Sequence, residues 1–222
     1  MVTINSTLIS GAGAIPAIAP LLTGKNKLLL VSDSNVIKLA ATQQILTLLQ
    51  AEGRRVQVID SVPPEPSQHD VARILGGSPD SAFDLVVGIG GGSVLDVTKL
   101  LSVLCHPRSP GLDALLAGEK PTARVPSLLI PATAGTGSEA TPNAILAIPE
   151  QNTKVGIISP VLLPDYVALL PELTTSMPAH IASSTGIDAL CHLIECFTAT
   201  IANPVSDNVA LTGLRKLQIG RA

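Results

Sequence analysis

Aromatic side chains and charge are both scarce in this chain of 222 residues. It has no tryptophan, and its aromatic residues are Phe83, Tyr166 and Phe197. Charged residues make up 14% of the chain, its net charge is −3, and no lysine- or arginine-rich run occurs. Nucleic-acid binding needs a basic surface and often aromatic platforms for the bases, so we expect no nucleic-acid partner.

Cysteines and long apolar runs are also few. The three cysteines (Cys105, Cys191 and Cys196) are an odd number without framework or CxxC spacing, which predicts free thiols in a reducing, cytoplasmic setting. Prolines interrupt the apolar runs before any reaches the length of a membrane span. The apolar N-terminal segment lacks the basic start of a signal peptide. We therefore expect a cytoplasmic protein without membrane contact.

Small aliphatic residues are abundant, and their pattern predicts an α/β fold. Short apolar runs typical of buried strands alternate with segments of helical spacing, which favours a parallel, helix-covered, Rossmann-like sheet. The predicted strands span residues 27–33, 54–60, 83–90 and 125–133, and the predicted helices span 34–53, 69–76 and 93–104.

The pattern changes after residue 140. Residues 144–148 and 154–158 are expected to pair as a hairpin, and 165–170 to form one more short strand. From about residue 175 only helical spacing is found. We therefore predict an α/β domain over 1–165 and, over 166–222, the beginning of an all-helical domain.

The segment "GIGGGSVLDVTK" (88–99) joins a predicted strand to a predicted helix. Its glycines allow backbone amides to approach an anion at a helix N-terminus, so Gly90, Gly91, Gly92 and Ser93 indicate a diphosphate cradle. Ser93 is expected to cap the helix as well. Asp96, which we count with the cofactor-binding residues, shares a helix face with Lys99. The alternative is a tight strand-to-helix turn with an ion pair behind it.

Two further features lie where strands end. "PATAGTGSEAT" (131–141) offers the hydroxyls of Thr133, Thr136 and Ser138 as a second wall of the same cleft, although such a loop can also be a simple turn. Asp33 ends the first predicted strand. It is placed either to accept a ribose hydroxyl or to cap the next helix.

"GIDALCHLIE" (186–195) carries Asp188 and His192 four residues apart, and therefore on one helix face. The pair suits a metal ion, but an ordinary side-chain hydrogen bond with a core histidine has the same spacing. A metal site needs three or four ligands. Glu195 shares the face, and His180 is the other histidine able to approach.

Together the three motifs resemble the iron-containing (group III) alcohol dehydrogenase family. The resemblance implies the dehydroquinate synthase-like fold and NAD(P)-dependent interconversion of a primary or small alcohol and its aldehyde or ketone. It implies that Gly90–Gly92 and Ser93 bind the pyrophosphate, that Thr133, Thr136 and Ser138 line the cofactor, and that Asp33 favours NAD over NADP. Asp188 and His192 match the first two ligands of an Fe(II) or Zn(II) ion, and a homo-oligomer is expected.

The resemblance also carries departures and alternatives. The family completes its metal site with two histidines further downstream, and this sequence ends before them, so we expect a truncated chain. No catalytic residue beyond the metal ligands is assigned in it. A nucleotide-binding remnant without catalysis is one alternative. A metal-independent enzyme similar to the maleylacetate reductases is another, against which the Asp188–His192 pair and the "TAGTGSE" string argue.

Overall fold

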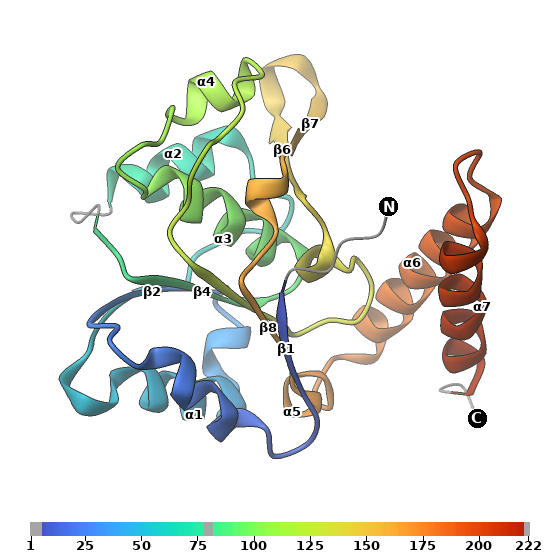
Figure 1. Ribbon diagram of the computed structural model, residues 1–222, viewed down its shortest axis with the longest axis horizontal. Helices are drawn as coiled ribbons and strands as arrows, with labels where there is room; N and C mark the ends of the chain where they lie inside the picture. The colour runs from blue at the N-terminus through green and yellow to red at the C-terminus, as the bar shows by residue number, and fades with distance from the viewer. Residues whose placement is uncertain (1–5, 78–81, 220–222) are drawn as a thin grey trace.

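A fully parallel six-stranded sheet forms the centre of the computed structural model, which describes residues 6–77 and 82–219 (Figure 1). The order across the sheet is β1-β8-β5-β4-β2-β3. The strands are β1 (Thr7–Ser10), β2 (Lys27–Val31), β3 (Arg55–Ile59), β4 (Leu85–Gly90), β5 (Ser127–Pro131) and β8 (Tyr166–Leu169). The predicted α/β class with a parallel sheet is confirmed.

Helices cover both faces of this sheet, so its central strands are buried on both sides. Strand β4 is buried at every position, which explains its unbroken apolar and glycine run. On one face lie the 3-10 helix η1 (Ile15–Leu22), α1 (Ala40–Gln50) and α5 (Pro171–Thr174). On the other lie α2 (Gln68–Gly76), α3 (Gly92–Leu104) and α4 (Leu112–Leu116).

The predicted hairpin is confirmed. Strands β6 (Asn143–Ile148) and β7 (Thr153–Ile158) form an antiparallel pair beyond α3 (Figure 1). Ala144, Leu146 and Ile157 pack into the same core cluster as α3. Helix α3 therefore lies between the sheet and the hairpin, and nine of its thirteen residues are buried.

The predicted helix over 34–53 is too long at its start. Val36–Lys38 is a separate 3-10 turn, and α1 begins only at Ala40 because the backbone of Leu39 is extended, with ψ 141°. The apolar spacing continues through this break, so periodicity alone could not locate it. Gly53, which we expected to stop the helix, has φ +74° at the end of the turn Ala51–Gly53.

The segment that follows the predicted domain boundary at residue 165 packs with the α/β part. Strand β8 lies inside the main sheet between β5 and β1, and Leu173 of α5 belongs to the core beside α1. The α/β part therefore extends through α5. The division into two domains stays a prediction.

Two helices stand beside the sheet as a pair. They are α6 (Ala179–Thr198) and α7 (Pro204–Ile219), packed on each other at one end of the molecule (Figure 1). Helix α6 has no buried residue. Among the described residues, no helix combines the length and the apolar character that crossing a membrane requires.

Candidate cofactor cleft at the carboxyl edge of the sheet

The strand order creates a switch point between β2 and β4. These strands are neighbours, but the chain leaves β2 towards α1 on one face and leaves β4 towards α3 on the other. In open α/β sheets, ligands bind outside the carboxyl ends of strands at such a point. Asp33 and Gly90–Gly92 both lie there, one segment following each strand.

The glycine loop is tightly enclosed where it passes from β4 into α3. A Cβ atom on Gly90 would lie 2.6 Å from Val94 Cβ, one turn into the helix. Gly91 is the N-cap of α3, so the first amides of the helix point out of this loop. No side chain fits at Gly90 without displacing Val94, so glycine at this position lets the end of β4 pack closely against the first turn of α3.

The second loop packs directly against the first. A Cβ atom on Gly92 would meet Thr136 Cγ2 at 2.7 Å, and one on Gly91 would lie 3.4 Å from Thr133 Oγ1. The two motifs are more than thirty residues apart in the sequence, yet they form adjoining walls. Their glycines and threonine hydroxyls together make a surface suited to phosphate oxygens.

Ser93 does not cap the helix as expected, because Gly91 occupies the N-cap position and Ser93 lies inside α3. Its hydroxyl instead accepts a hydrogen bond of 3.2 Å from the amide of Glu65. Glu65 has a φ of +50° and pairs with Lys154 of β7 at 2.8 Å. The sequence analysis missed this third segment, whose only signal was the proline on each side of Glu65.

The side chain of Asp33 binds the turn that follows it, but Asp33 is not the N-cap of a helix, since Asn35 and Leu39 hold that position for Val36–Lys38 and α1. Asp33 Oδ1 accepts the amides of Asn35 and Val36, each at 2.9 Å. The preceding residue, Ser32, is fully buried and donates to the carbonyl of Ile89 at 2.8 Å, which ties the end of β2 to the end of β4. The carboxylate is thereby fixed beside the glycine loop.

Asp96 and Lys99 form the ion pair that their spacing predicted, with 2.9 Å between Nζ and Oδ1. The Asp96 carboxylate also accepts the hydroxyl of Ser138 at 2.5 Å and the amide of Ile145 at 3.1 Å. Burial lowers the pKa of Lys99, and the nearby Asp96 opposes this shift. Two predicted cofactor residues, Asp96 and Ser138, are therefore bonded to each other.

Helix α6 reaches the second loop about a third of the way along its length. A Cβ atom on Gly135 would lie 2.8 Å from the carbonyl oxygen of Thr185. Asp188 follows Thr185 by less than one turn, and His192 by about two turns. The third motif therefore joins the first two at the same end of the sheet.

Asp188 and His192 are the candidate metal ligands of this chain. His192 Nδ1 and Asp188 Oδ2 are 3.9 Å apart, and both side chains are about half exposed, so His192 is not a core histidine. His180 lies eight residues before Asp188 on the same helix, about 12 Å along its axis, which is too far to share an ion. Within residues 6–77 and 82–219, no group of three His, Cys, Asp or Glu side chains is arranged to hold a metal. The pair suits one side of an ion.

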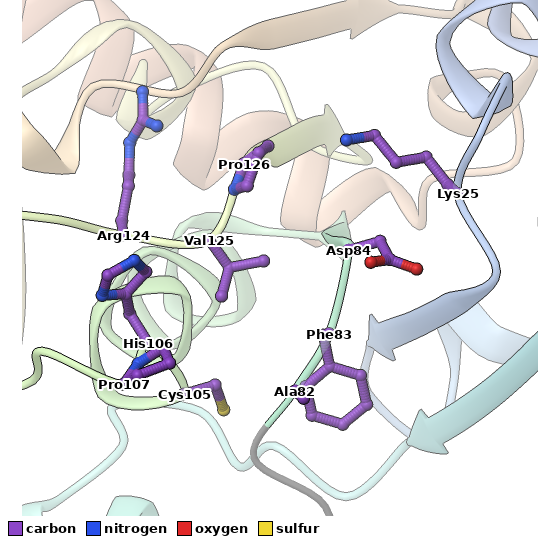
Figure 2. Close-up of a pocket in the computed structure, with 10 residues that line it drawn as sticks. All are labelled: Lys25, Ala82, Phe83, Asp84, Cys105, His106, Pro107, Arg124, Val125 and Pro126. Carbon is purple, nitrogen blue, oxygen red and sulfur yellow. The ribbon is translucent and has the colours of Figure 1, made fainter.

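A cavity of about 360 Å³ opens at the opposite, amino edge of the sheet (Figure 2). Asp84, at its wall, accepts the amides of Asn26 and Lys27, and these bonds lower the pKa of its carboxyl. Arg124 donates to the carbonyl of Leu163 and pairs with Asp165 at 2.8 Å. These interactions join the segments that lead into the strands. The charged groups at this cavity therefore have a structural role, and the candidate cofactor site remains at the carboxyl edge.

Comparisons with known proteins agree with this geometry. The sequence profile described as iron-containing alcohol dehydrogenase matches residues 5–171. The long-chain-alcohol dehydrogenase 1 of Geobacillus thermodenitrificans is 35% identical over 210 residues, which cover 92% of this chain and 53% of that protein. The chain spans about half the length of the curated relatives it matches.

Solved structures show the same fold. An iron-containing alcohol dehydrogenase from Thermotoga maritima superposes with a TM-score of 0.89 at 30% identity, over 99% of this chain and 62% of that one. A sulfoacetaldehyde reductase from Bifidobacterium kashiwanohense, solved in complex with NAD+, gives a TM-score of 0.82 at 28% identity, over 94% of this chain and 56% of that one.

Proposed function

We propose, since this chain belongs to the iron-containing alcohol dehydrogenase family, that the protein interconverts a primary or small alcohol and its aldehyde or ketone. NAD serves as the hydride acceptor in this proposal. The observation that carries it is the contact between the two glycine-containing loops at the switch point, which builds one cleft from two distant motifs. Fe(II) or Zn(II) is the proposed metal, and a homo-oligomer the proposed assembly.

The proposed cofactor contacts follow from the cleft. The amides of Gly91 and Gly92, the hydroxyl of Ser93 and those of Thr133 and Thr136 face the diphosphate in this proposal. Thr133 and Thr136 already line the glycine loop. Asp33 disfavours a phosphate on the ribose because two like charges would meet at the end of β2. The protein is therefore proposed to prefer NAD to NADP.

The proposed metal ligands in this chain are Asp188 and His192. A carboxylate and an imidazole suit either Fe(II) or Zn(II). When bound, the metal supplies Lewis-acid stabilisation of the substrate oxygen. The chain's own part is to place those two side chains on α6, whose contact with Gly135 sets the helix against the cofactor loops.

The experiment is an assay of NADH formation by the purified 222-residue chain with short primary alcohols and NAD, with Fe(II) or Zn(II) added and then removed by a chelator. Metal-dependent turnover supports the proposal. NADH binding without turnover supports the alternative of a nucleotide-binding protein without catalysis. Turnover that survives the chelator supports the metal-independent alternative.

Calorimetry with Zn(II) tests the ligands separately from turnover. With two ligands we expect weak binding by the wild-type chain, and no binding by Asp188→Ala or His192→Ala. His180→Ala is the matched control, since it removes a histidine from the same helix about 12 Å from Asp188. Loss of binding in the control as well would contradict the assignment.

A further inference from the structure

A lysine at the centre of α3 is fully buried, with 0% of its side chain exposed. Its ammonium group does not reach the cleft. It donates to the carbonyl oxygen of Ser138 at 2.9 Å, to Thr141 Oγ1 at 3.3 Å and to the carbonyl oxygen of Asn143. All three acceptors lie at the end of the second loop or at the start of β6. Lys99 therefore ties α3 to the segment that carries Thr133 and Thr136.

Asp96 completes this arrangement from one turn earlier. Besides pairing with Lys99, its two oxygens accept the Ser138 hydroxyl and the Ile145 amide. We call these two side chains the Asp96–Lys99 latch. Between them they hold one end of the second loop through its main chain and through its serine side chain.

Stability alone does not account for a latch of this kind. Burial disfavours the charged form of lysine, and apolar side chains of similar volume often replace a buried ion pair with equal or greater stability. Apolar side chains cannot hold the loop in one orientation, because they form no hydrogen bonds to the Ser138 carbonyl or hydroxyl. The distinctive contribution of the pair is thus the position of the loop.

We propose that the Asp96–Lys99 latch holds the second loop against the glycine loop, and that Asp96, Lys99 and Ser138 are positioning residues for NAD rather than contacts to it. This inference rests on the proposed function, since it assumes that the cleft binds NAD. It assigns the direct contacts to Thr133 and Thr136, whose side chains lie beside Gly91 and Gly92. Ser138 is 5% exposed, and its hydroxyl is already donated to Asp96.

The test replaces both charges at once, so that no unpaired charge is left buried. In the variant Asp96→Leu/Lys99→Met, we expect NADH to bind about tenfold more weakly, within the range of couplings between residues of one network. The melting temperature should fall, because the carbonyls of Ser138 and Asn143 lose a donor, so binding is titrated at a temperature where both proteins are folded. The titration follows the fluorescence of NADH itself, since the protein has no tryptophan.

The control is an ion pair far from the two loops. Arg124 and Asp165 pair at 2.8 Å at the amino edge of the sheet, beside the cavity of Figure 2. The variant Arg124→Met/Asp165→Leu should bind NADH as the wild type does, even if it melts earlier. Weakened binding in this control equal to that in the latch variant would show a general effect of losing an ion pair, and would overturn the proposal.

Ser138→Ala distinguishes positioning from direct contact. In the wild-type background it should weaken NADH binding by about threefold, as the loss of one hydrogen bond does. In the Asp96→Leu/Lys99→Met background it should have no further effect, because its partner is gone. A direct contact would lower the affinity by the same factor in both backgrounds, and that result overturns the proposal.

The remaining outcomes are also decisive. A latch variant that binds NADH as tightly as the wild type overturns the latch while leaving the proposed function intact. A wild-type chain that binds no NADH overturns the proposed function and this inference with it. Should the double variant fail to fold, Thr141→Val removes one acceptor of Lys99 without changing the size of the side chain. Unchanged binding in both Thr141→Val and Ser138→Ala then overturns the latch.

Discussion

A single methyl group at Gly92 would occupy space that Thr136 now fills. Its Cβ would lie 2.7 Å from Thr136 Cγ2 and 2.8 Å from Oγ1, closer than such atoms approach in proteins. Gly92→Ala should therefore separate the two loops, and we expect NADH affinity to fall by about tenfold or more. Titration of NADH fluorescence measures the change.

Gly91→Ala is the matched control for that prediction. Its Cβ would lie 3.4 Å from Thr133 Oγ1, which is an ordinary contact, although the two glycines are adjacent. We expect a smaller loss of affinity than in Gly92→Ala. An equal loss of NADH affinity in the two variants would contradict the prediction, because it would not depend on the contact between the loops.

The three thiols differ in burial, and their reactivity should differ accordingly. Cys105 is buried, and burial raises the pKa of its thiol from 9.0 to about 11, while Cys191 and Cys196 are exposed. Because the thiolate is the reactive form, iodoacetamide at neutral pH should modify Cys191 and Cys196 well before Cys105. Mass spectrometry of the native protein after brief labelling checks the order.

The same shift has a consequence for stability. The folded state holds the Cys105 proton more tightly than the unfolded state does, so unfolding is favoured once the unfolded thiol ionises. The contribution of Cys105 to the free energy of unfolding should be constant below pH 9 and fall between pH 9 and about 11. In Cys105→Ala this fall should be smaller than in the wild type. An identical alkaline profile for both proteins would contradict it.

At the scale of elements, the contact between the second loop and α6 should be sensitive to the addition of a single methyl group. Gly135→Ala would press a Cβ against the main-chain oxygen of Thr185 at 2.8 Å, where no side-chain rotation relieves it. We expect the free energy of unfolding to fall by about 1–3 kcal/mol, the usual effect of overpacking. Urea denaturation measures it.

Gly186→Ala, on helix α6, should have the opposite effect on the free energy of unfolding. Gly186 lies inside α6, and a Cβ there would meet nothing within 4 Å. Alanine should stabilise the helix by up to about 1 kcal/mol, because glycine is the poorer helix former. If both variants were destabilised equally, the loop contact would not be the cause of the Gly135 effect.

Elements were easier to predict than their junctions. The four strands predicted before residue 140, the hairpin and the two last helices follow from apolar spacing, because each carries a regular apolar face. The break at Leu39 does not, since Val36 and Leu39 continue the stripe of α1 while the backbone is extended between them. The same limit applies to β8, because Tyr166–Leu169 is too short a run to reveal which strands it pairs with.

At the scale of the whole molecule, the site divides into what is local and what is long-range. The glycine loop and the Asp188–His192 pair are visible in short stretches of sequence. Two other contacts cannot be read from a short stretch, because each joins distant segments. The Glu65 amide and the Ser93 hydroxyl are 28 residues apart, and Lys99 and Ser138 are 39 residues apart. A lysine in a helix is ordinarily exposed, so the burial of Lys99 depends on the hairpin that covers α3.

Most of the exposed large apolar side chains of the described residues lie on α6, α7 and the loop between them. They are Ile187, Ile194, Phe197, Ile201, Val205, Val209 and Leu211. In the described part of the two helices, Ala210 alone is buried. Surfaces of this kind bind apolar dyes and associate when nothing covers them. We expect the purified 222-residue chain to enhance the fluorescence of anilinonaphthalene sulfonate and to sediment as larger species as its concentration rises.

Two lysines on this face should reverse both effects. Val205 and Val209 are 58% and 64% exposed and lie one turn apart on α7, so Val205→Lys/Val209→Lys places two charges in the patch without disturbing a core residue. Ile158→Lys is the control, because Ile158 is 59% exposed but belongs to the hairpin on β7. Dye binding and association that fall in the α7 variant and persist in the control locate the apolar surface on the helical pair. A wild-type chain that stays monomeric and binds no dye would show that the two helices bury this face against each other or against the sheet in solution.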